Sequence, residues 1–376
     1  MAWILWVCRN PSLVIRACAN CQTGALVSGA GITADSLNSQ DIEKQGTKQL
    51  LTDDEILGNS FVFILAGHET AANTLHFSML YLAMNWSSQA RLQKDLDEIF
   101  GDRPVSAWDY DHDVPKLFES MAGAVMNEEL RLIPPVIGIP KCTAKTSPQP
   151  MTVNGKRIVV PADSHVTLST AAVHRNPRYW PTMCGPSASD AEIERDLDSF
   201  KPERWLLDSS AANHHHHGTA DSSSSSSQHS DTEHDHDHDN EDFGGPGGRD
   251  TAATLFRPPR GAYIPFSEGA RGCLGRRFAQ IEVLAVLAVI FREYSVELAV
   301  DSDSDSDSDG TASGDREEDP VAAMNEAQRR EVWGKARSHA EDLLKTGMGT
   351  IITLQMRKGK IPMRFVKRGG ERFRFG

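Results

Sequence analysis

The chain has little cysteine, which excludes a disulfide-stabilised secreted scaffold. Its 376 residues include only six cysteines, and their spacing shows no disulfide framework, which fits a reducing compartment. They stand at positions 8, 18, 21, 142, 184 and 273. Cys18 and Cys21 form a C-x-x-C pair, but the lack of a second pair or a nearby histidine makes a zinc site a weak hypothesis.

A membrane-spanning run and a basic patch are also absent. The apolar segment Met1–Val7 falls far short of the roughly 20 residues of a transmembrane helix, and a buried or membrane-grazing segment is favoured over a signal-peptide fragment. No cluster of Lys and Arg is large enough to suggest nucleic acid. The formal net charge of −13 is local, because Asp301–Asp309 holds five aspartates and residues 231–242 hold seven acids.

A long helix is the first strong element of the chain. Thr52–Glu55 forms a capping box, and residues 56–84 are apolar on all faces, which predicts burial in the middle of a domain. At 1.5 Å per residue the helix would be about 45–50 Å long. The segment Gly67–Thr70 interrupts it with a charge, which excludes a membrane span. In the simplest explanation Glu69 is paired and Thr70 bonds back to its own helix.

A glycine-rich loop carries one cysteine just before a second apolar helix, predicted over residues 276–292. Residues 266–275 read Phe-Ser-Glu-Gly-Ala-Arg-Gly-Cys-Leu-Gly. The start of a helix favours an anion and lowers a thiol's pKa, so Cys273 suits a metal-bound thiolate, although a lone cysteine is more often an inert apolar residue. Gly269 and Gly275 would let the backbone turn sharply against a bulky cofactor, and Arg271 suits a carboxylate.

The pattern F-x-x-G-x-R-x-C-x-G resembles the haem-binding loop of the cytochrome P450 family, with every position filled. The resemblance implies that Cys273 is the axial thiolate ligand of the iron of haem b, a ligand that favours O–O cleavage. It also implies that Phe266, Gly269, Arg271 and Gly275 help to bind the haem.

Two further positions are interpreted through the same resemblance. Ala66–Thr70 is similar to the family's A/G-G-x-D/E-T signature, in which the glycine leaves room for dioxygen while the acid and the threonine steer protons to it. This implies catalytic roles for Glu69 and Thr70. Lys141 stands where the family usually has a basic residue that contacts a haem propionate, and a solvated lysine explains it equally well.

A structural charge triad is implied by two more motifs. Glu128-x-x-Arg131, just before a Pro-Pro pair, resembles the family's E-x-x-R, and Phe200–Trp205 resembles its P-E-R-F/W element. The resemblance implies that Glu128, Arg131 and Arg204 form a buried triad that locks the haem loop in place. His174 is interpreted as a packing or hydrogen-bonding residue and not as a metal ligand.

The remaining patterns predict a mainly α fold with small β-sheets, the cytochrome P450 fold of a fungal-like enzyme that lacks its N-terminal part. Helices are expected at Ser87–Phe100, Leu117–Leu132 and Glu326–Lys345. Strands are expected at Thr152–Val160, which contains an Asn-Gly turn signal, and at His165–Ala171, Tyr294–Val300, Thr350–Met356 and Ile361–Val366, the last two as a terminal hairpin.

The chain is expected to divide at two low-complexity insertions. Residues 52–207 carry the long helix, the E-x-x-R helix and part of the sheet, 251–300 the haem loop and its helix, and 320–376 the terminal helix and hairpin, after an unmatched segment at 1–51. The insertions at 208–250 and 301–319 are too polar to order themselves. The first is rich in histidine, so weak metal binding is an alternative to a plain solvated loop.

The resemblance implies a haem-thiolate monooxygenase of secondary metabolism at the endoplasmic reticulum membrane. It would insert one oxygen atom from O2 into an apolar small molecule, with electrons from an NADPH-dependent reductase docking near Arg271, Arg276 and Arg277. No nucleic-acid partner is expected. The residues before the long helix match nothing that precedes it in the family. The alternative is therefore a truncated, non-catalytic remnant with weak or no haem binding, whose uncovered apolar helix causes aggregation or membrane association.

Overall fold

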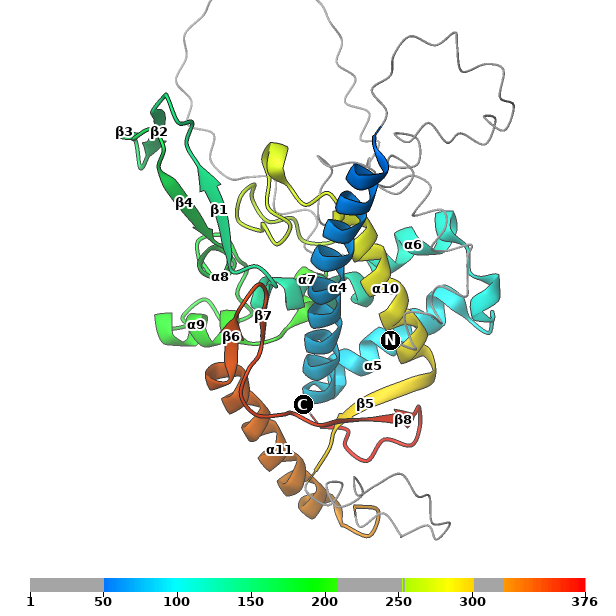
Figure 1. Cartoon of the computed structure of the whole chain (residues 1–376). Helices are drawn as coiled ribbons and strands as arrows, with labels where there is room; N and C mark the ends of the chain where they lie inside the picture. The colour runs from blue at the N-terminus through cyan, green and yellow to red at the C-terminus, as the bar shows by residue number, and fades with distance from the viewer. Residues whose placement is uncertain (1–50, 208–251, 253, 301–320, 376) are drawn as a thin grey trace, which may run out of the picture.

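The computed structural model describes residues 51–207, 252, 254–300 and 321–375, and the predictions for the apolar start of the chain and for both insertions lie outside them (Figure 1). The α-helices are α4 (Asp53–Met84), α5 (Trp86–Phe100), α6 (Tyr110–Glu119), α7 (Met121–Leu132), α8 (Thr170–Val173), α9 (Asp190–Asp198), α10 (Arg276–Glu293) and α11 (Glu326–Thr346). The strands are β1 (Gly138–Cys142), β2 (Gln149–Val153), β3 (Lys156–Val160), β4 (His165–Ser169), β5 (Tyr294–Leu298), β6 (Met348–Thr350), β7 (Leu354–Met356) and β8 (Met363–Lys367).

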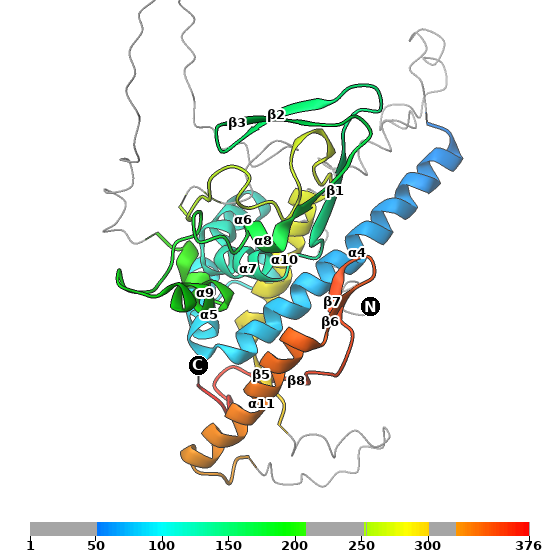
Figure 2. The ribbon, with the colours of Figure 1, turned by 90° about the vertical axis from the view of Figure 1, so that its left-hand side faces the viewer.

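Helix α4 begins as predicted but is buried over only part of its length. The Thr52 hydroxyl accepts a bond from the Glu55 N–H, and the Glu55 carboxylate accepts one from the Thr52 N–H. Five apolar side chains between residues 57 and 65 are 51–71% exposed, namely Leu57, Phe61, Val62, Ile64 and Leu65. Figure 2 shows this end of α4 standing out from the body. The expected burial along the whole helix is therefore wrong, because fully buried residues occur only from Ala71 onward.

The core forms where the second half of α4 meets α5, α7 and α10 (Figure 1). Every residue of α7 is buried, and α10 buries Leu284, Leu287 and Phe291 completely. The apolar helix predicted after the cysteine loop is thus present and anchors the end of that loop. None of the described helices combines the length and the hydropathy of a bilayer span.

The helix predicted over Leu117–Leu132 is two helices. Ser120 lies between α6 and α7 in an extended conformation, and its hydroxyl accepts a bond from the Ala122 N–H. A side chain at Gly123 would put its Cβ 2.1 Å from the Phe118 carbonyl oxygen. The glycine therefore lets the new helix start close against the end of the previous one.

The sheets are four separate antiparallel pairs: β1–β4, β2–β3, β5–β8 and β6–β7. The segment Thr152–Val160 is not one strand but most of the β2–β3 hairpin, and the tight turn predicted at its Asn154-Gly155 pair is confirmed, since these residues adopt φ of +51° and +74°. The predicted terminal hairpin is also wrong. β7 pairs with β6, whereas β8 pairs with β5, at the end of α10.

Helix α11 confirms the prediction for residues 326–345 almost to the residue. Asn325 and Gln328 form its capping box. Trp333 on this helix packs with Val300, Val321 and Phe373 in a small second core. That cluster fixes α11 and the C-terminal residues to the end of β5.

Candidate functional site

The loop that carries the predicted ligand is closed by its own backbone. The Cys273 N–H donates to the Phe266 carbonyl oxygen at 2.8 Å, and the Gly272 N–H donates to the Gly269 carbonyl oxygen at 2.8 Å. Gly269 has a φ of +77° and the turn residue Ser267 has a φ of +61°, so both residues lie in the left-handed region. These bonds give residues 266–273 a defined shape.

The backbone at Gly275 does not make the sharp turn that was predicted there. Gly275 precedes the first residue of α10 with φ of −85°, a value open to any residue, so the sharp turn expected there is not found. The turn lies at Gly269 and Ser267 instead. The expected role of Gly275 beside a cofactor remains a proposal.

Cys273 lies at the surface of this loop, two residues before Gly275, the residue that directly precedes α10. Leu274 beside it is 62% exposed, and Arg271 is exposed on the same loop, whereas Phe266 is half-buried against the main core. The loop therefore presents one thiol, one cation and one apolar side chain outward. This donor set fits haem, which needs a thiolate for iron and cations for its carboxylates.

A second cation reaches the loop from β1. The ammonium of Lys141 donates to the Ser267 hydroxyl at 2.8 Å and to the Glu268 carbonyl oxygen at 3.4 Å. The explanation of Lys141 as a merely solvated residue is thus wrong, because the side chain is half-buried and bonded to the loop. The described residues contain no group of three His, Cys, Asp or Glu side chains that could hold a metal ion.

The three arginines suggested for partner docking differ in exposure. Arg271 is exposed, whereas Arg276 and Arg277 are half-buried. The Arg277 guanidinium lies 3.9 Å from the centre of the Phe118 ring, and burial lowers the pKa of Arg277 to about 10. Arg277 therefore stays charged at neutral pH but is partly committed to packing.

The hydrogen bonds of the α4 motif Ala66–Thr70 are those of the simpler explanation, in which Glu69 is paired and Thr70 bonds back to its own helix. The Thr70 hydroxyl donates to the carbonyl oxygen of Ala66 at 2.9 Å. Glu69 accepts bonds from the side chains of Thr353 at 2.6 Å and Gln355 at 3.2 Å. Gly67 is exposed, with no heavy atom within 4 Å of the place a Cβ would take. The described bonds of Glu69 and Thr70 thus run to α4 and the β6–β7 turn rather than to the cysteine loop.

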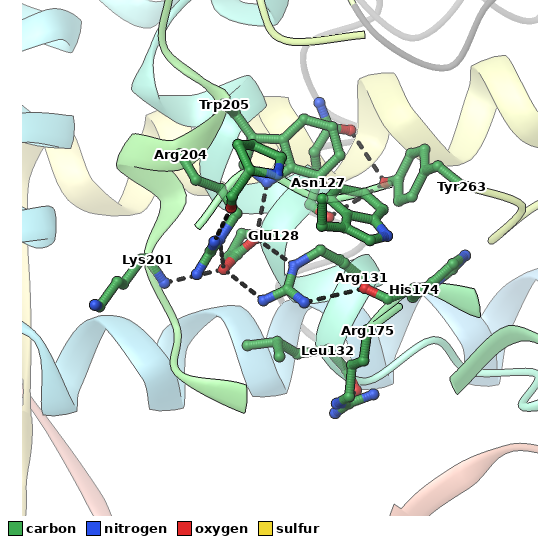
Figure 3. A network of polar contacts seen from close by, with 12 residues as sticks. Asn127, Glu128, Arg131, Leu132, His174, Arg175, Lys201, Arg204, Trp205 and Tyr263 are labelled. Atoms are coloured by element: carbon green, nitrogen blue, oxygen red, sulfur yellow. Dashed lines mark hydrogen bonds and ion pairs between the residues drawn. The ribbon is translucent and has the colours of Figure 1, made fainter. Parts of the chain in front are cut away.

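Figure 3 shows that the structure brings Glu128, Arg131 and Arg204 together. The Arg131 guanidinium binds both carboxylate oxygens of Glu128 at 2.8 and 2.9 Å, and Arg204 Nε binds one of them at 3.0 Å. The Trp205 indole N–H and the Lys201 backbone N–H complete the shell. Burial alone would raise the pKa of Glu128, but the two guanidiniums and these donors hold it below its ordinary value.

The triad and its helix connect to the segment just before the cysteine loop through His174 and Tyr263, which Figure 3 shows beside Arg131 and Asn127. Arg131 Nη1 donates to the His174 carbonyl oxygen at 3.1 Å, and the His174 ring accepts a bond from the Ile264 backbone N–H at 2.9 Å. The Tyr263 hydroxyl lies 3.3 Å from the Asn127 side-chain oxygen. Burial lowers the pKa of His174 to about 3, so its ring is neutral and keeps this acceptor.

Sequence reasoning missed two features of this region. It gave His174 a hydrogen-bonding role but not its link between Arg131 and Ile264. It also overlooked Glu129, a fully buried carboxyl next to the triad. Among the described residues neither oxygen of Glu129 has a hydrogen-bond partner, and burial raises its pKa well above the ordinary value. The only available signal was a second acid directly beside Glu128, in the E-x-x-R motif that the family resemblance predicted to be buried.

Comparisons with known proteins agree with these motifs. The family described as "Cytochrome P450" matches residues 31–219 and 250–315, so the match begins within the segment 1–51 that was expected to be unmatched. A cytochrome P450 monooxygenase of Arthrobotrys oligospora is 30% identical, over 69% of this chain and 37% of that protein. One of Penicillium rubens is 29% identical, over 67% of this chain and 37% of that protein.

A third relative, of Aspergillus oryzae, is named as a bifunctional cytochrome P450/NADPH–P450 reductase. It is 26% identical, over 65% of this chain and 17% of that protein. The chain thus spans little more than a third of the length of the first two relatives. Because the family description matches well over half of its residues, the chain belongs to the cytochrome P450 family.

Proposed function

We propose that the chain carries the haem-thiolate centre of a monooxygenase, with Cys273 as the sole protein ligand of the iron. The observation that carries this proposal is the position of Cys273, exposed on a loop that its own backbone N–H closes onto Phe266. When bound, haem would supply the dioxygen chemistry that no side chain can supply. The protein supplies binding, orientation and proton transfer.

Each nearby residue has a role in this proposal. Lys141 and Arg271 place cations at the loop, where they would bind the haem carboxylates. The triad holds the loop through His174 and Ile264. Glu69 and Thr70 steer protons on the α4 side of the site, since both carry side-chain oxygens beside the exposed Gly67.

We further propose an apolar small-molecule substrate, and an NADPH-dependent reductase as the electron donor. The apolar character of the α4 surface at residues 57–65 supports the first. A relative whose name joins a cytochrome P450 to its reductase supports the second, and Arg271 offers that partner an exposed cation. The endoplasmic reticulum membrane is the location proposed from the family.

A second candidate is a chain that binds haem weakly and does not turn over. Five large apolar side chains on the first half of α4 are more than half exposed. An open site of this kind admits water, which would compete with productive chemistry. Haem content of the purified chain separates the two candidates, since the first requires close to one haem per chain.

The ligand assignment is tested by the spectrum of the reduced, CO-bound protein. We expect the red-shifted Soret band of thiolate ligation in the parent chain and its loss in Cys273→Ala. Cys142→Ala is the matched control, because Cys142 is also an exposed cysteine but lies on β1, and this variant should keep the band. A Cys273→Ala protein that retains the band would overturn the assignment.

A further inference from the structure

Strands β1 and β4 place a cysteine directly opposite a histidine. Cys142 is the last residue of β1 and His165 is the first residue of β4, and the two are partners in the antiparallel register. Figure 1 shows the two strands side by side. Directly opposed residues of an antiparallel pair project from the same face of the sheet. A thiol and an imidazole therefore share one face of the β1–β4 pair.

The hydrogen-bond pattern of the two strands brings this pair close together. The Thr143 N–H donates to the Ser164 carbonyl oxygen at 3.0 Å, which makes these two residues a hydrogen-bonded pair. Hydrogen-bonded and non-hydrogen-bonded pairs alternate, so Cys142 and His165 form a non-hydrogen-bonded pair, whose Cα atoms are about 4.5 Å apart. Pro140, which has no N–H to donate, fits the same alternation. Side-chain rotation can thus bring the thiol within hydrogen-bond reach of a ring nitrogen.

Both members of the pair are available for reaction. Cys142 is a free and exposed cysteine, and His165 is exposed as well. Among the described residues neither side chain has a hydrogen bond or an ion pair to another group. The adjacent Lys141 side chain projects from the opposite face, where it bonds Ser267 of the cysteine loop. The face of Cys142 and His165 is therefore open and separate from the candidate haem site.

Few charged groups surround the pair. Lys145 follows β1 and Asp163 precedes β4, and both residues are exposed. Helix α8, which also packs against β1, carries no charged side chain. Imidazole is the side chain that most readily takes up and releases a proton near neutral pH. His165 is thus the group directly opposite Cys142 that can accept the proton of the thiol.

We propose that Cys142 is a modification site for a small disulfide such as glutathione disulfide, with His165 as the proton acceptor. The thiolate is the form of cysteine that attacks a disulfide. His165 takes the proton of the Cys142 thiol, and the thiolate attacks one sulfur of glutathione disulfide. A bond forms between that sulfur and Cys142 while the original S–S bond breaks. The released glutathione thiolate takes the proton from His165, so the Cys142 sulfur is oxidised and one glutathione leaves reduced.

The site is tested by treating the full chain with glutathione disulfide and following each modified cysteine by peptide mass spectrometry, a measurement that does not depend on haem. Cys142 should gain glutathione about tenfold faster than Cys184, whose half-buried thiol donates to the Glu192 carbonyl oxygen at 3.6 Å. His165→Asn should slow the reaction of Cys142 about tenfold, and free imidazole in the buffer should restore part of the rate. Thr167→Asn, at an exposed position on the same face of β4, is the matched control and should change nothing.

A swap of the two groups separates a proton acceptor from a structural residue. Cys142→His combined with His165→Cys keeps the pair but exchanges its strands, so the thiol at position 165 should react at about the parent rate. Equal rates at Cys142 and Cys184, or a His165→Asn chain that reacts as fast as the parent, would overturn the proposal. A slow His165→Asn chain that neither imidazole nor the swap restores would overturn the role of His165 as proton acceptor.

Discussion

The ammonium of Lys141 on β1 lies 2.8 Å from the hydroxyl oxygen of Ser267, which belongs to the cysteine loop 126 residues later. Ser267 holds a positive φ at that point, so the contact ties a strand to the least regular part of the loop. Lys141 thereby orders the loop from one side while His174 orders its stem from the other. Two independent contacts of this kind make the loop geometry less dependent on its ligand.

Replacing Lys141 is expected to weaken haem binding more than folding. Lys141→Ala removes two bonds to the loop and one cation, so haem affinity should fall by about 1–2 kcal/mol, or roughly 5–30-fold. Haem titration followed by absorbance measures this change. Lys145→Ala, an exposed lysine in the connection after β1, is the control, and an equal loss in both variants would contradict a specific role of Lys141.

Breaking the triad should strongly lower the free energy of unfolding. Arg131→Ala leaves Glu128 buried beside one remaining guanidinium, and removal of one partner of a buried ion pair costs about 3–5 kcal/mol. Both side chains are 0% exposed. Denaturant unfolding followed by circular dichroism should show this loss. Lys94→Ala breaks an exposed pair with Glu98 and should cost at most about 0.5 kcal/mol, so similar losses would contradict the argument.

Thr70 is expected to matter for proton transfer rather than for stability. Its hydroxyl bonds back to α4, so Thr70→Ala should lower the free energy of unfolding by only about 1 kcal/mol. The measurement is the ratio of hydrogen peroxide to product in turnover with a reductase, which should rise. Ser60→Ala removes an equivalent bond on the same helix, at 2.8 Å to the Ile56 carbonyl oxygen, and should leave the ratio unchanged. Equal ratios for both variants would leave Thr70 with a structural role only.

Glu129 makes the stability of the chain fall as pH rises. Its pKa is raised in the folded state, so between the unfolded value near 4.5 and the folded value the folded chain binds the extra proton. Considering Glu129 alone, the folded state is most favoured below about pH 4.5, and this contribution is lost progressively as the pH rises from there toward the raised folded pKa.

Substitution of Glu129 should therefore stabilise the chain. Glu129→Leu removes a buried group without a described partner and should raise the free energy of unfolding at pH 7 by about 1–3 kcal/mol. Thermal unfolding of both proteins from pH 4.5 to 7 measures this, and the difference should shrink toward pH 4.5. Glu119→Leu, at an exposed acid, should stay within about 0.5 kcal/mol. A destabilised Glu129→Leu protein would refute the account.

The exposed apolar surface of α4 is expected to drive association. Exposed apolar patches beyond a few hundred square ångströms mark contact sites or aggregation liabilities. The parent chain should therefore elute as oligomers in size-exclusion chromatography with light scattering. Combining Leu57→Gln, Phe61→Gln and Ile64→Gln should shift it toward the monomer. Met183→Gln, a control at a residue 53% exposed elsewhere, should not, and a monomeric parent would contradict the prediction.

Local signals were sufficient for much of the fold and the site. The helices α5, α10 and α11 were predicted from the local pattern of their apolar and polar residues, and the contact between Glu128, Arg131 and Arg204 was predicted from the family resemblance. The failures involve partners that sequence spacing cannot identify. Met363–Lys367 looks like one half of a local hairpin, but pairs with β5, a strand far back along the chain. Similarly, a helical pattern does not show that Gly123 is the place where two helices meet closely.

The hydrogen-bond donors to Glu69 also could not be predicted from the sequence. Its spacing on α4 indicates a need for a hydrogen-bond donor, but any nearby donor would satisfy that need. The donors found, Thr353 in the β6–β7 turn and Gln355 on β7, lie in a hairpin whose own sequence gives no sign of this contact. Only the three-dimensional structure shows that the motif and the C-terminal turn are coupled.

The pairing of β5 with β8 also bears on the length of the chain between them. The pair closes a loop of residues 299–362, which includes the acidic insertion at 301–319. In the unfolded chain the entropy of bringing the two strands together grows only with the logarithm of the number of residues between them, so removal of that insertion would change this closure free energy by only about 0.3 kcal/mol. The segment beside β5 can therefore gain or lose residues at little thermodynamic cost to the strand that follows the haem-loop helix.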